Sequence, residues 1–255
     1  MIVWGGSEMF QNVNTGGRYS PTTDSWTATT INNAPSERDG HTAVWTGNQM
    51  IIWGGVSASA TGTGGIYCAQ SQAPAVQSAV SRKTHGGAGS FDVNLPLTGT
   101  PGIECRTGSA TNDYSMVVTF SSNVNVTGSP QAQVTSGTGC VGTGGVCNGN
   151  VSVSGNAVTV PLTNISNAQT IDVRINGVNS TSDAPATDFT IPMSILIGDT
   201  NANATVNAAD VAQTKARLGQ TVGATNFRSD VNANGSINAA DTAVIKQHSG
   251  TSLPP

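Results

Sequence analysis

Apolar and polar residues alternate most regularly between about residue 90 and residue 197. Stretches of period two, which place every second side chain on one face of an extended chain, occur at 114–120, 171–175 and 189–197. A further stretch, 151–162, alternates on both sides of a Ser-Gly-Asn turn and predicts a hairpin. Short strands spaced by about ten residues and separated by Gly, Asn and Ser turns favour a β-sandwich.

The N-terminal region repeats itself with a period close to 49 residues. MIVWGG at 1–6 returns as MIIWGG at 50–55, and TGGRY at 15–19 returns as TGGIY at 63–67. Repeats of this period indicate stacked structural units. The pattern resembles the kelch repeat, whose units are four-stranded blades of a β-propeller, and the resemblance covers residues 1–67. It implies that this region is a partial kelch propeller.

A propeller closes its ring only with several blades, whereas this chain holds one full period and the opening of a second. Since Met1 aligns with Met50, inside a repeat, we expect the chain to be the C-terminal piece of a longer protein or a reading frame whose true start lies further upstream. An isolated blade exposes its edges and faces, so we expect this region to be poorly supported. The Ser/Ala/Gln/Gly passage 68–89 predicts a linker. The predicted sandwich, 90–197, resembles the immunoglobulin-like spacers of secreted bacterial proteins.

Short oxygen-bearing side chains recur at every second position near the C-terminus. GDTNANATVNAAD at 198–210 returns as SDVNANGSINAAD at 229–241, a spacing of 31 residues. Each copy is a 12-residue loop with oxygen donors at positions 1, 3, 5, 9 and 12 and a backbone carbonyl at position 7, which is the spacing that wraps a chain around calcium. The predicted ligands are Asp199, Asn201, Asn203, Thr205, Asn207 and Asp210 in the first loop and Asp230, Asn232, Asn234, Ser236, Asn238 and Asp241 in the second. The alternative is a pair of Asn- and Ala-rich surface turns.

Each loop runs into a short predicted helix that stops at Gly219 or Gly250. Loop then helix, twice, resembles the type I dockerin over residues 199–250, which makes 198–255 a small α-helical domain. The resemblance implies that two calcium ions fold the helix pair and that one helical face docks onto a cohesin domain. The implied contact residues are Ala208, Ala209 and Lys215 in one copy and Ala239, Ala240 and Lys246 in the other. Alternatively, these alanines only form the first helical turn, because alanine is the best helix former.

The two loops differ at position 6, where the sharp turn favours a positive φ and therefore glycine. The second loop has Gly235, but the first has Ala204, so we expect about 1 kcal/mol of strain in the first site. Each loop also has only two carboxylates. This low ligand charge predicts weak binding, with a Kd of roughly 10⁻⁴ to 10⁻³ M.

Composition excludes several functional classes. Charged residues make up 9% of the chain, and the net charge of −4 with no basic run argues against a nucleic-acid partner. No apolar run reaches the length of a transmembrane helix, and the segment after Met1 lacks the features of a signal peptide. The three histidines are scattered among the predicted regions, and no nucleophile elbow, zinc-protease or phosphate-loop motif occurs. We therefore expect no enzyme in this chain.

The four cysteines contain no C-x-x-C pair, which disfavours zinc or thioredoxin-like chemistry. Cys140 and Cys147 flank a glycine-rich loop, and we expect a disulfide between them. Cys68 and Cys105 are a candidate second bridge, and four free thiols are the alternative. Because disulfides persist outside the reducing cytosol, we expect an extracellular, monomeric protein whose signal peptide lies upstream.

These observations lead to three hypotheses. The first is a calcium-dependent, non-catalytic attachment module that docks to a cohesin in a cellulosome-like assembly. The second is the tail of a secreted carbohydrate-active enzyme of polysaccharide breakdown, an O-glycosyl hydrolase for example, whose catalytic part is missing. The third keeps the calcium but has no cohesin partner, so that the loops brace a structural or adhesion domain.

Overall fold

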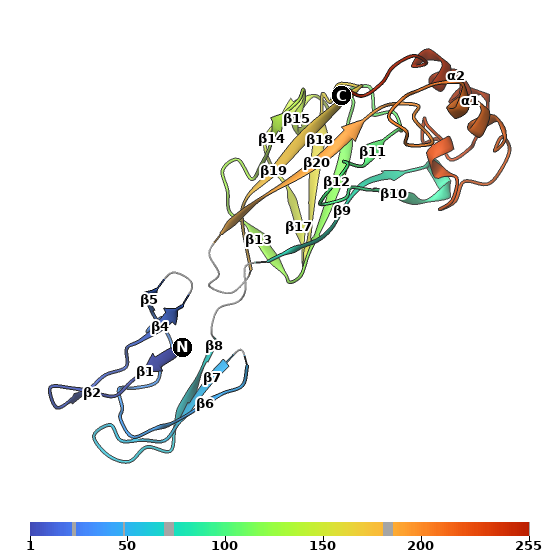
Figure 1. Cartoon of the computed structure of the whole chain (residues 1–255). Helices are drawn as coiled ribbons and strands as arrows, with labels where there is room; N and C mark the ends of the chain where they lie inside the picture. The colour runs from blue at the N-terminus through green and yellow to red at the C-terminus, as the bar shows by residue number, and fades with distance from the viewer. Residues whose placement is uncertain (22–23, 48, 69–73, 181–185, 255) are drawn as a thin grey trace. The chain divides into compact units, whose positions relative to one another are not determined.

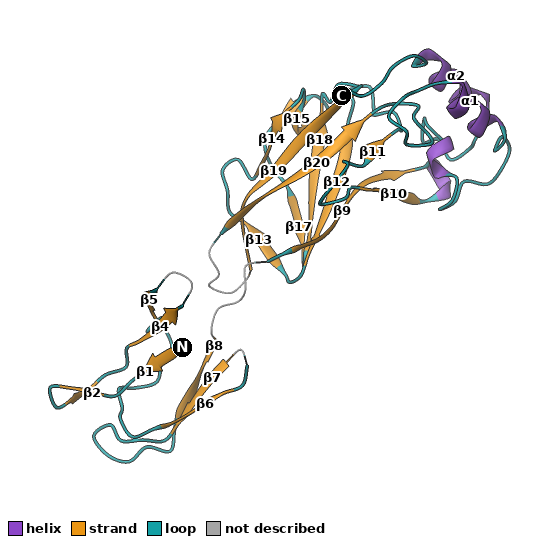
Figure 2. Ribbon diagram, viewed as in Figure 1, coloured by secondary structure: helices purple, strands orange, loops and turns teal. Residues whose placement is uncertain are grey.

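The computed structural model describes residues 1–21, 24–47, 49–68, 74–180 and 186–254, and it is mainly β, as the sequence predicts (Figures 1 and 2). The chain forms two compact units, Met1–Ser71 and Gln72–Pro255. Both α-helices of the described part lie in the second unit. Neither of these described helices is long and apolar enough to cross a membrane.

The first unit holds two three-stranded antiparallel sheets, in the orders β1-β4-β5 and β6-β7-β8, and the hairpin β2-β3. Its strands are β1 (Ile2–Trp4), β2 (Ser7–Glu8), β3 (Gln11–Asn12), β4 (Gly16–Ser20), β5 (Ser25–Ala28), β6 (Thr42–Trp45), β7 (Gln49–Trp53) and β8 (Gly64–Cys68). The sequence repeat is also a structural repeat, because Trp4 pairs with Gly16 in one sheet as Trp53 pairs with Gly64 in the other. Each sheet has three strands, and the kelch-type blade stays a prediction.

Residues that are equivalent in the repeat are buried on opposite faces of the two sheets. Trp4 is 7% exposed and packs with Met50 and Ile52, whereas its equivalent, Trp53, is 61% exposed. Conversely Ile52 is 4% exposed, and its equivalent, Val3, is 50% exposed. The Trp4 face of the first sheet therefore packs on the Met50 and Ile52 face of the second sheet. The equivalent tryptophan face of the second sheet, which carries Trp53, is exposed.

The second unit contains two sheets that enclose one core, which is the predicted sandwich. One sheet has the order β10-β9-β12-β18-β15-β16, with β17 beside β18, and the other has the order β11-β20-β19-β13, with β14 beside β19. The strands are β9 (Val76–Thr84), β10 (Ser90–Asn94), β11 (Ile103–Glu104), β12 (Tyr114–Phe120), β13 (Val124–Val126), β14 (Ala132–Ser136), β15 (Cys140–Thr143), β16 (Val146–Cys147), β17 (Ser152–Ser154), β18 (Ala157–Thr163), β19 (Gln169–Ser180) and β20 (Thr187–Ile195). The immunoglobulin-like assignment is finer than this architecture and stays a prediction.

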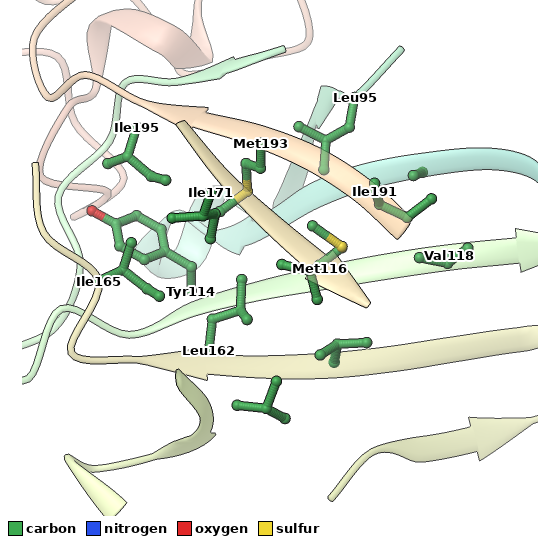
Figure 3. Packing of buried hydrophobic residues seen from close by; sticks show 14 of the residues in the cluster. Leu95, Tyr114, Met116, Val118, Leu162, Ile165, Ile171, Ile191, Met193 and Ile195 are labelled. Atoms are coloured by element: carbon green, nitrogen blue, oxygen red, sulfur yellow. The ribbon is translucent and has the colours of Figure 1, made fainter. Parts of the chain in front are cut away.

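The core confirms the alternation read from the sequence. Met116 and Val118 of β12 face Ile171 of β19 and Met193 of β20 across the space between the sheets (Figure 3). The predicted hairpin forms between β17 and β18, with Ser154 opposite Ala157. The same core cluster continues into the C-terminal segment through residues that include Val206, Val231 and Ile245. The predicted sandwich and the predicted helical domain therefore share one hydrophobic core.

The predicted linker, 68–89, is wrong over most of its length. Residues 69–73 lie outside the described residues, but Val76–Thr84 form β9, which pairs with both β10 and β12. Its most buried positions are Ala79 and Ser81, small residues that do not produce an apolar alternation. The sandwich thus begins earlier than residue 90.

Three of the four cysteines have described side chains, two of them in a disulfide and one as a buried thiol. Cys140 and Cys147 form the predicted disulfide, with a Cα–Cα distance of 5.6 Å, across the β15–β16 hairpin. Cys105 is a free thiol with no solvent exposure, and its Sγ donates to the Arg228 carbonyl. The candidate bridge from Cys105 is therefore wrong, and the side chain of its suggested partner, Cys68, lies outside the described residues.

Candidate functional site

Two loop–helix segments form the candidate site at one end of the second unit (Figure 2). The helices are α1 (Ala208–Lys215) and α2 (Ala239–Gln247), with a 3₁₀ turn, η2 (Phe227–Ser229), between the two segments. Each helix begins with a capping box, in which an asparagine side chain and an aspartate three residues later satisfy backbone N–H groups at the helix start. Gly219 and Gly250, the predicted stop residues, follow the helices and both have a positive φ.

In the first half of loop 1, backbone N–H groups bind the predicted ligand oxygens. Asp199 Oδ1 accepts from Asn203 N (3.1 Å), and its Oδ2 accepts from Ala204 N (2.9 Å). The side-chain oxygens of Asn201 and Asn203 accept from Asn203 N and Thr205 N, both at 3.0 Å. The loop backbone thus fixes the direction of each oxygen that is predicted to bind the metal.

In the second half of loop 1, Asp210 closes the loop. Its Oδ1 accepts from Asn201 N (3.2 Å) and its Oδ2 from Asn207 N (2.9 Å). Asn207 Oδ1 accepts from Ala209 N (2.7 Å), so this side chain is the helix cap. Asn207, predicted as a ligand at position 9, therefore has a structural role as well, and a water-mediated contact is common at this position.

Loop 2 repeats these hydrogen bonds. Asn234 N and Gly235 N donate to the two oxygens of Asp230, at 3.1 and 2.8 Å. Asp241 accepts from Asn232 N and Asn238 N, and Asn238 caps α2 as Asn207 caps α1. The remaining bonds, to Asn232 Oδ1 and Asn234 Oδ1, also match, and the second of these comes from Ser236 N. The 12 predicted ligand positions are therefore brought together as two loops with the same internal bonding.

The turn at position 6 has the expected conformation in both loops. Ala204 has a φ of 67° and Gly235 a φ of 90°. Position 4 is also left-handed, at Ala202 (60°) and Ala233 (54°), which the sequence did not lead us to expect. The strain predicted at Ala204 thus has a conformational basis, because a positive φ raises the free energy of an L-residue that has a Cβ.

The electrostatics and the donor set fit a calcium ion. Asp199, Asp210 and Asp241 have no solvent exposure, and within the described residues none of them forms an ion pair. Burial raises the pKa of Asp199, and the charge of Asp210 raises it further. Burial and the charge of Asp230 act in the same direction on the pKa of Asp241. Buried carboxylates that repel one another, surrounded by amide and carbonyl oxygens, favour a hard divalent cation.

The two loop–helix segments interlock. Val206, at position 8 of loop 1, exchanges backbone hydrogen bonds with Gly250 and Thr251, which follow α2. Ile237, at the same position of loop 2, accepts from Gly219 N, which follows α1. Each loop is thus fixed by the end of the other segment's helix, so the pair forms one structural element.

The sandwich holds this pair through groups that the sequence analysis did not identify. The Arg228 guanidinium donates to the carbonyl oxygens of Ile103, Asp199 and Thr200, at 3.0, 2.8 and 3.1 Å. Phe227 stacks on Phe91 of β10, with ring centroids 5.4 Å apart. These contacts join β11 to η2 and to the entrance of loop 1, and they join β10, a strand of the other sheet, to η2.

A second set of contacts reaches loop 2. His85, which falls within the predicted linker, lies 2.8 Å from Asp230 Oδ2 through its Nδ1. Its Nε2 lies 3.1 Å from Arg106 Nη1, and Arg106 forms a fully buried ion pair with Glu104 at 2.6 Å. His85 and Asp230 are 145 residues apart in the chain. The only local signal was the pair of charges at Glu104, the last residue of β11, and Arg106, two residues later, in a chain with few charges.

The implied docking residues lie on the surface of both helices. Ala208, Ala209 and Lys215 are exposed, and so are their equivalents Ala239, Ala240 and Lys246. The alanines are also the first residues of α1 and α2, so their predicted role as the first helical turn is confirmed. Their role in docking is compatible with this position and stays a prediction.

The chain was compared with protein families, curated sequences and solved structures. A family model described as the dockerin type I domain matches residues 197–248, which are the two loops with their helices. No curated protein sequence matches the chain, and no solved structure matches it.

Proposed function

We propose that residues 197–248 are a calcium-dependent docking module that attaches this chain to a cohesin-type domain of another protein. The observation that carries this proposal is the matching backbone hydrogen bonding of the two loops, which twice gathers buried carboxylates beside amide oxygens. Within the described residues, Asp199, Asp210 and Asp241 form no ion pair. Type I dockerin domains bind calcium, and the match to that family supports the same role here. The loop ligands would be those predicted from the spacing, with Asn207 and Asn238 acting through water.

A bound calcium ion would supply positive charge among the buried carboxylates, and the protein's own groups supply the geometry. Asp210 and Asp241 link each loop to its helix, because the same carboxylate closes the loop and completes the capping box. A cation held among the loop carboxylates would offset their mutual repulsion, so that each loop stays closed on the first turn of its helix, which presents the exposed alanines. The docking surface forms only when the loops are ordered.

A titration of the whole chain with CaCl₂ tests the metal. We expect saturable heat and a gain of helicity in far-ultraviolet circular dichroism, both reversed by a chelator. The matched control is the double variant Asp210→Asn, Asp241→Asn, which keeps the side-chain volumes and removes two charges. No heat and no change of helicity up to several millimolar calcium would contradict the proposal.

The partner is tested separately with a panel of cohesin-type domains in the presence of calcium. Because the duplication presents the same surface twice, we expect Lys215→Glu or Lys246→Glu alone to retain binding and the double variant to lose it. Binding that survives the double variant, or that needs no calcium, would refute docking by these helices.

A second candidate function is favoured by one observation, the shared core of the sandwich and the loop–helix pair. On this proposal the calcium sites brace an extracellular structural domain that has no cohesin partner. The Cys140–Cys147 disulfide supports an extracellular location. Calcium binding and stabilisation without binding to any cohesin domain would favour this candidate over docking.

A further inference from the structure

Four charged or polar side chains form a buried row from the sandwich to loop 2. Glu104, Arg106, His85 and Asp230 have no solvent exposure. The row is joined by contacts of 2.6 Å from Arg106 Nη2 to Glu104, 3.1 Å from Arg106 Nη1 to His85 and 2.8 Å from His85 to Asp230. Its far end, Asp230, is position 1 of the second loop.

The bonding of Arg106 decides which nitrogen of His85 carries the proton. All five guanidinium N–H groups have partners, because Nε and Nη2 reach Glu104, Nη2 also reaches the Ser81 carbonyl, and Nη1 reaches the Phe91 carbonyl. The remaining N–H of Nη1 points to His85 Nε2. Arginine only donates, so Nε2 accepts and the neutral ring carries its proton on Nδ1. His85 therefore donates to Asp230 Oδ2.

This bond makes the two oxygens of Asp230 differ in the hydrogen bonds that they accept. Oδ2 accepts from both His85 Nδ1 and Gly235 N, each at 2.8 Å. Among the described residues, Oδ1 accepts only from Asn234 N, at 3.1 Å. The carboxylate is thus held by its Oδ2, and its Oδ1 stays available to a cation.

The backbone beside His85 also lies against loop 2. A Cβ at Gly86 would be 2.3 Å from the Asn234 carbonyl oxygen, and a Cβ at Gly235 would be 2.9 Å from the His85 carbonyl oxygen. The turn that carries His85 is therefore fitted to positions 5 and 6 of this loop.

Loop 1 has no equivalent arrangement within the described residues. Asp199 Oδ2 accepts from Ala204 N, and the nearby Arg228 donates to the Asp199 carbonyl instead of the carboxylate. The two loops match in their internal bonds but differ in this external one.

We propose that His85 is a positioning residue of the second calcium site, which fixes the first ligand of that site from the sandwich and leaves the first site unaided. This inference rests on the proposed calcium function of the loops. Groups that orient metal ligands typically contribute 10- to 100-fold to metal affinity. The second site is accordingly the tighter one, and its affinity depends on a residue outside the loop–helix segments.

The test isolates each site in the full-length chain. Asp210→Asn disables the first loop and Asp241→Asn disables the second, and calcium affinity is measured by calorimetry in each background with His85 or with His85→Phe. We expect His85→Phe to weaken the second site at least tenfold and to leave the first site unchanged. An equal loss at both sites would show a general structural effect, and no loss at the second site would also overturn the proposal.

The variant His85→Asn separates positioning from packing. The Asn side-chain nitrogen occupies the same place along the side chain as Nδ1 of histidine, so it can donate to Asp230. We expect His85→Asn to keep affinity at the second site within about threefold of the unmodified residue. Loss as large as that of His85→Phe would refute the donor role. If the unmodified chain binds no calcium, both proposals fail, whereas normal binding that is insensitive to His85→Phe sinks only this one.

Discussion

Exchanging the residues at position 6 of the two loops is the most direct test of how the loop conformation limits calcium binding. Ala204 and Gly235 both have a positive φ, but only Ala204 carries a Cβ that makes this conformation unfavourable. We predict that Ala204→Gly stabilises the calcium-loaded chain and that Gly235→Ala destabilises it. Because the backbone hydrogen bonds inside the two loops match, each loop serves as the reference for the other.

The two changes differ in magnitude. Relief of left-handed strain at Ala204 contributes about 1–2 kcal/mol, and the greater freedom of glycine in the unfolded chain removes about 0.4–1 kcal/mol. The net gain is about 1 kcal/mol, or about fivefold in an equilibrium constant. Gly235→Ala loses the same amount and in addition places a Cβ 2.9 Å from the His85 carbonyl oxygen. Since overpacking costs about 1–3 kcal/mol, we expect Gly235→Ala to lose about 2 kcal/mol or more.

Two assays locate the gain. Calorimetric titration gives the affinity of each site, and thermal unfolding in saturating calcium gives the stability of the loaded chain. If the metal-free loop is already formed, Ala204→Gly raises stability with or without calcium. If the loop forms on binding, the gain appears as tighter binding at the first site.

The reasoning is refuted if Ala204→Gly changes neither quantity, because the positive φ would then carry no strain. It is also refuted if Gly235→Ala costs no more than Ala204→Gly gains. That result would show that the turn at His85 moves freely and does not press on loop 2.

Two further predictions concern the two cores. Burial raises the pKa of Glu104, but the charge and hydrogen bonds of Arg106 outweigh it and hold this pKa below the ordinary value of 4.5. Glu104 therefore stabilises the fold fully above pH 4.5 and loses this contribution as the pH falls through its lowered pKa, so Glu104→Gln should cost about 3–5 kcal/mol at neutral pH and less in acid. The raised pKa values of Asp199 and Asp241 change the free energy of unfolding in the opposite direction, but they do so equally in variant and parent. The difference between the two chains in urea unfolding therefore isolates Glu104. A difference that does not depend on pH would contradict the assignment. In the first unit, Trp4→Ala should cost about 3–5 kcal/mol and abolish the unfolding transition of that unit in tryptophan fluorescence. Trp53→Ala should change the free energy of unfolding of the unit by less than about 1 kcal/mol. Equal effects would show that the opposite burial of the two rings is wrong.

The sequence predicts those parts of the site whose information is local. A ligand list with fixed spacing, repeated after 31 residues, predicts both loops and the helices that follow them. The spacing of Asn207 and Asp210 is also a local capping-box signal. His85 could not be found in this way, because its partner Asp230 is 145 residues away and only the fold brings them together.

The same distinction applies to the fold. Strand β12 was predicted because its inward positions are large and apolar. Strand β9 was missed because its inward positions include Ala79 and Ser81, and Ser81 faces inward to donate to Glu104. Polar residues at core positions break the period-two pattern, and here they do so because the strand helps to hold a buried ion pair.

The opposite burial of equivalent residues in the first unit gives its sheets a polarity. A sheet of this repeat has one tryptophan face and one Met-Ile face, and each kind covers the other kind. Association through these faces is therefore head to tail, and a two-fold axis, which would set like against like, cannot satisfy it. A row of such sheets leaves one face of each kind uncovered at its two ends, whatever its length. Exposure at Val3 and exposure at Trp53 therefore have one cause, because each residue lies on the face of its sheet that has no second sheet of the described unit against it.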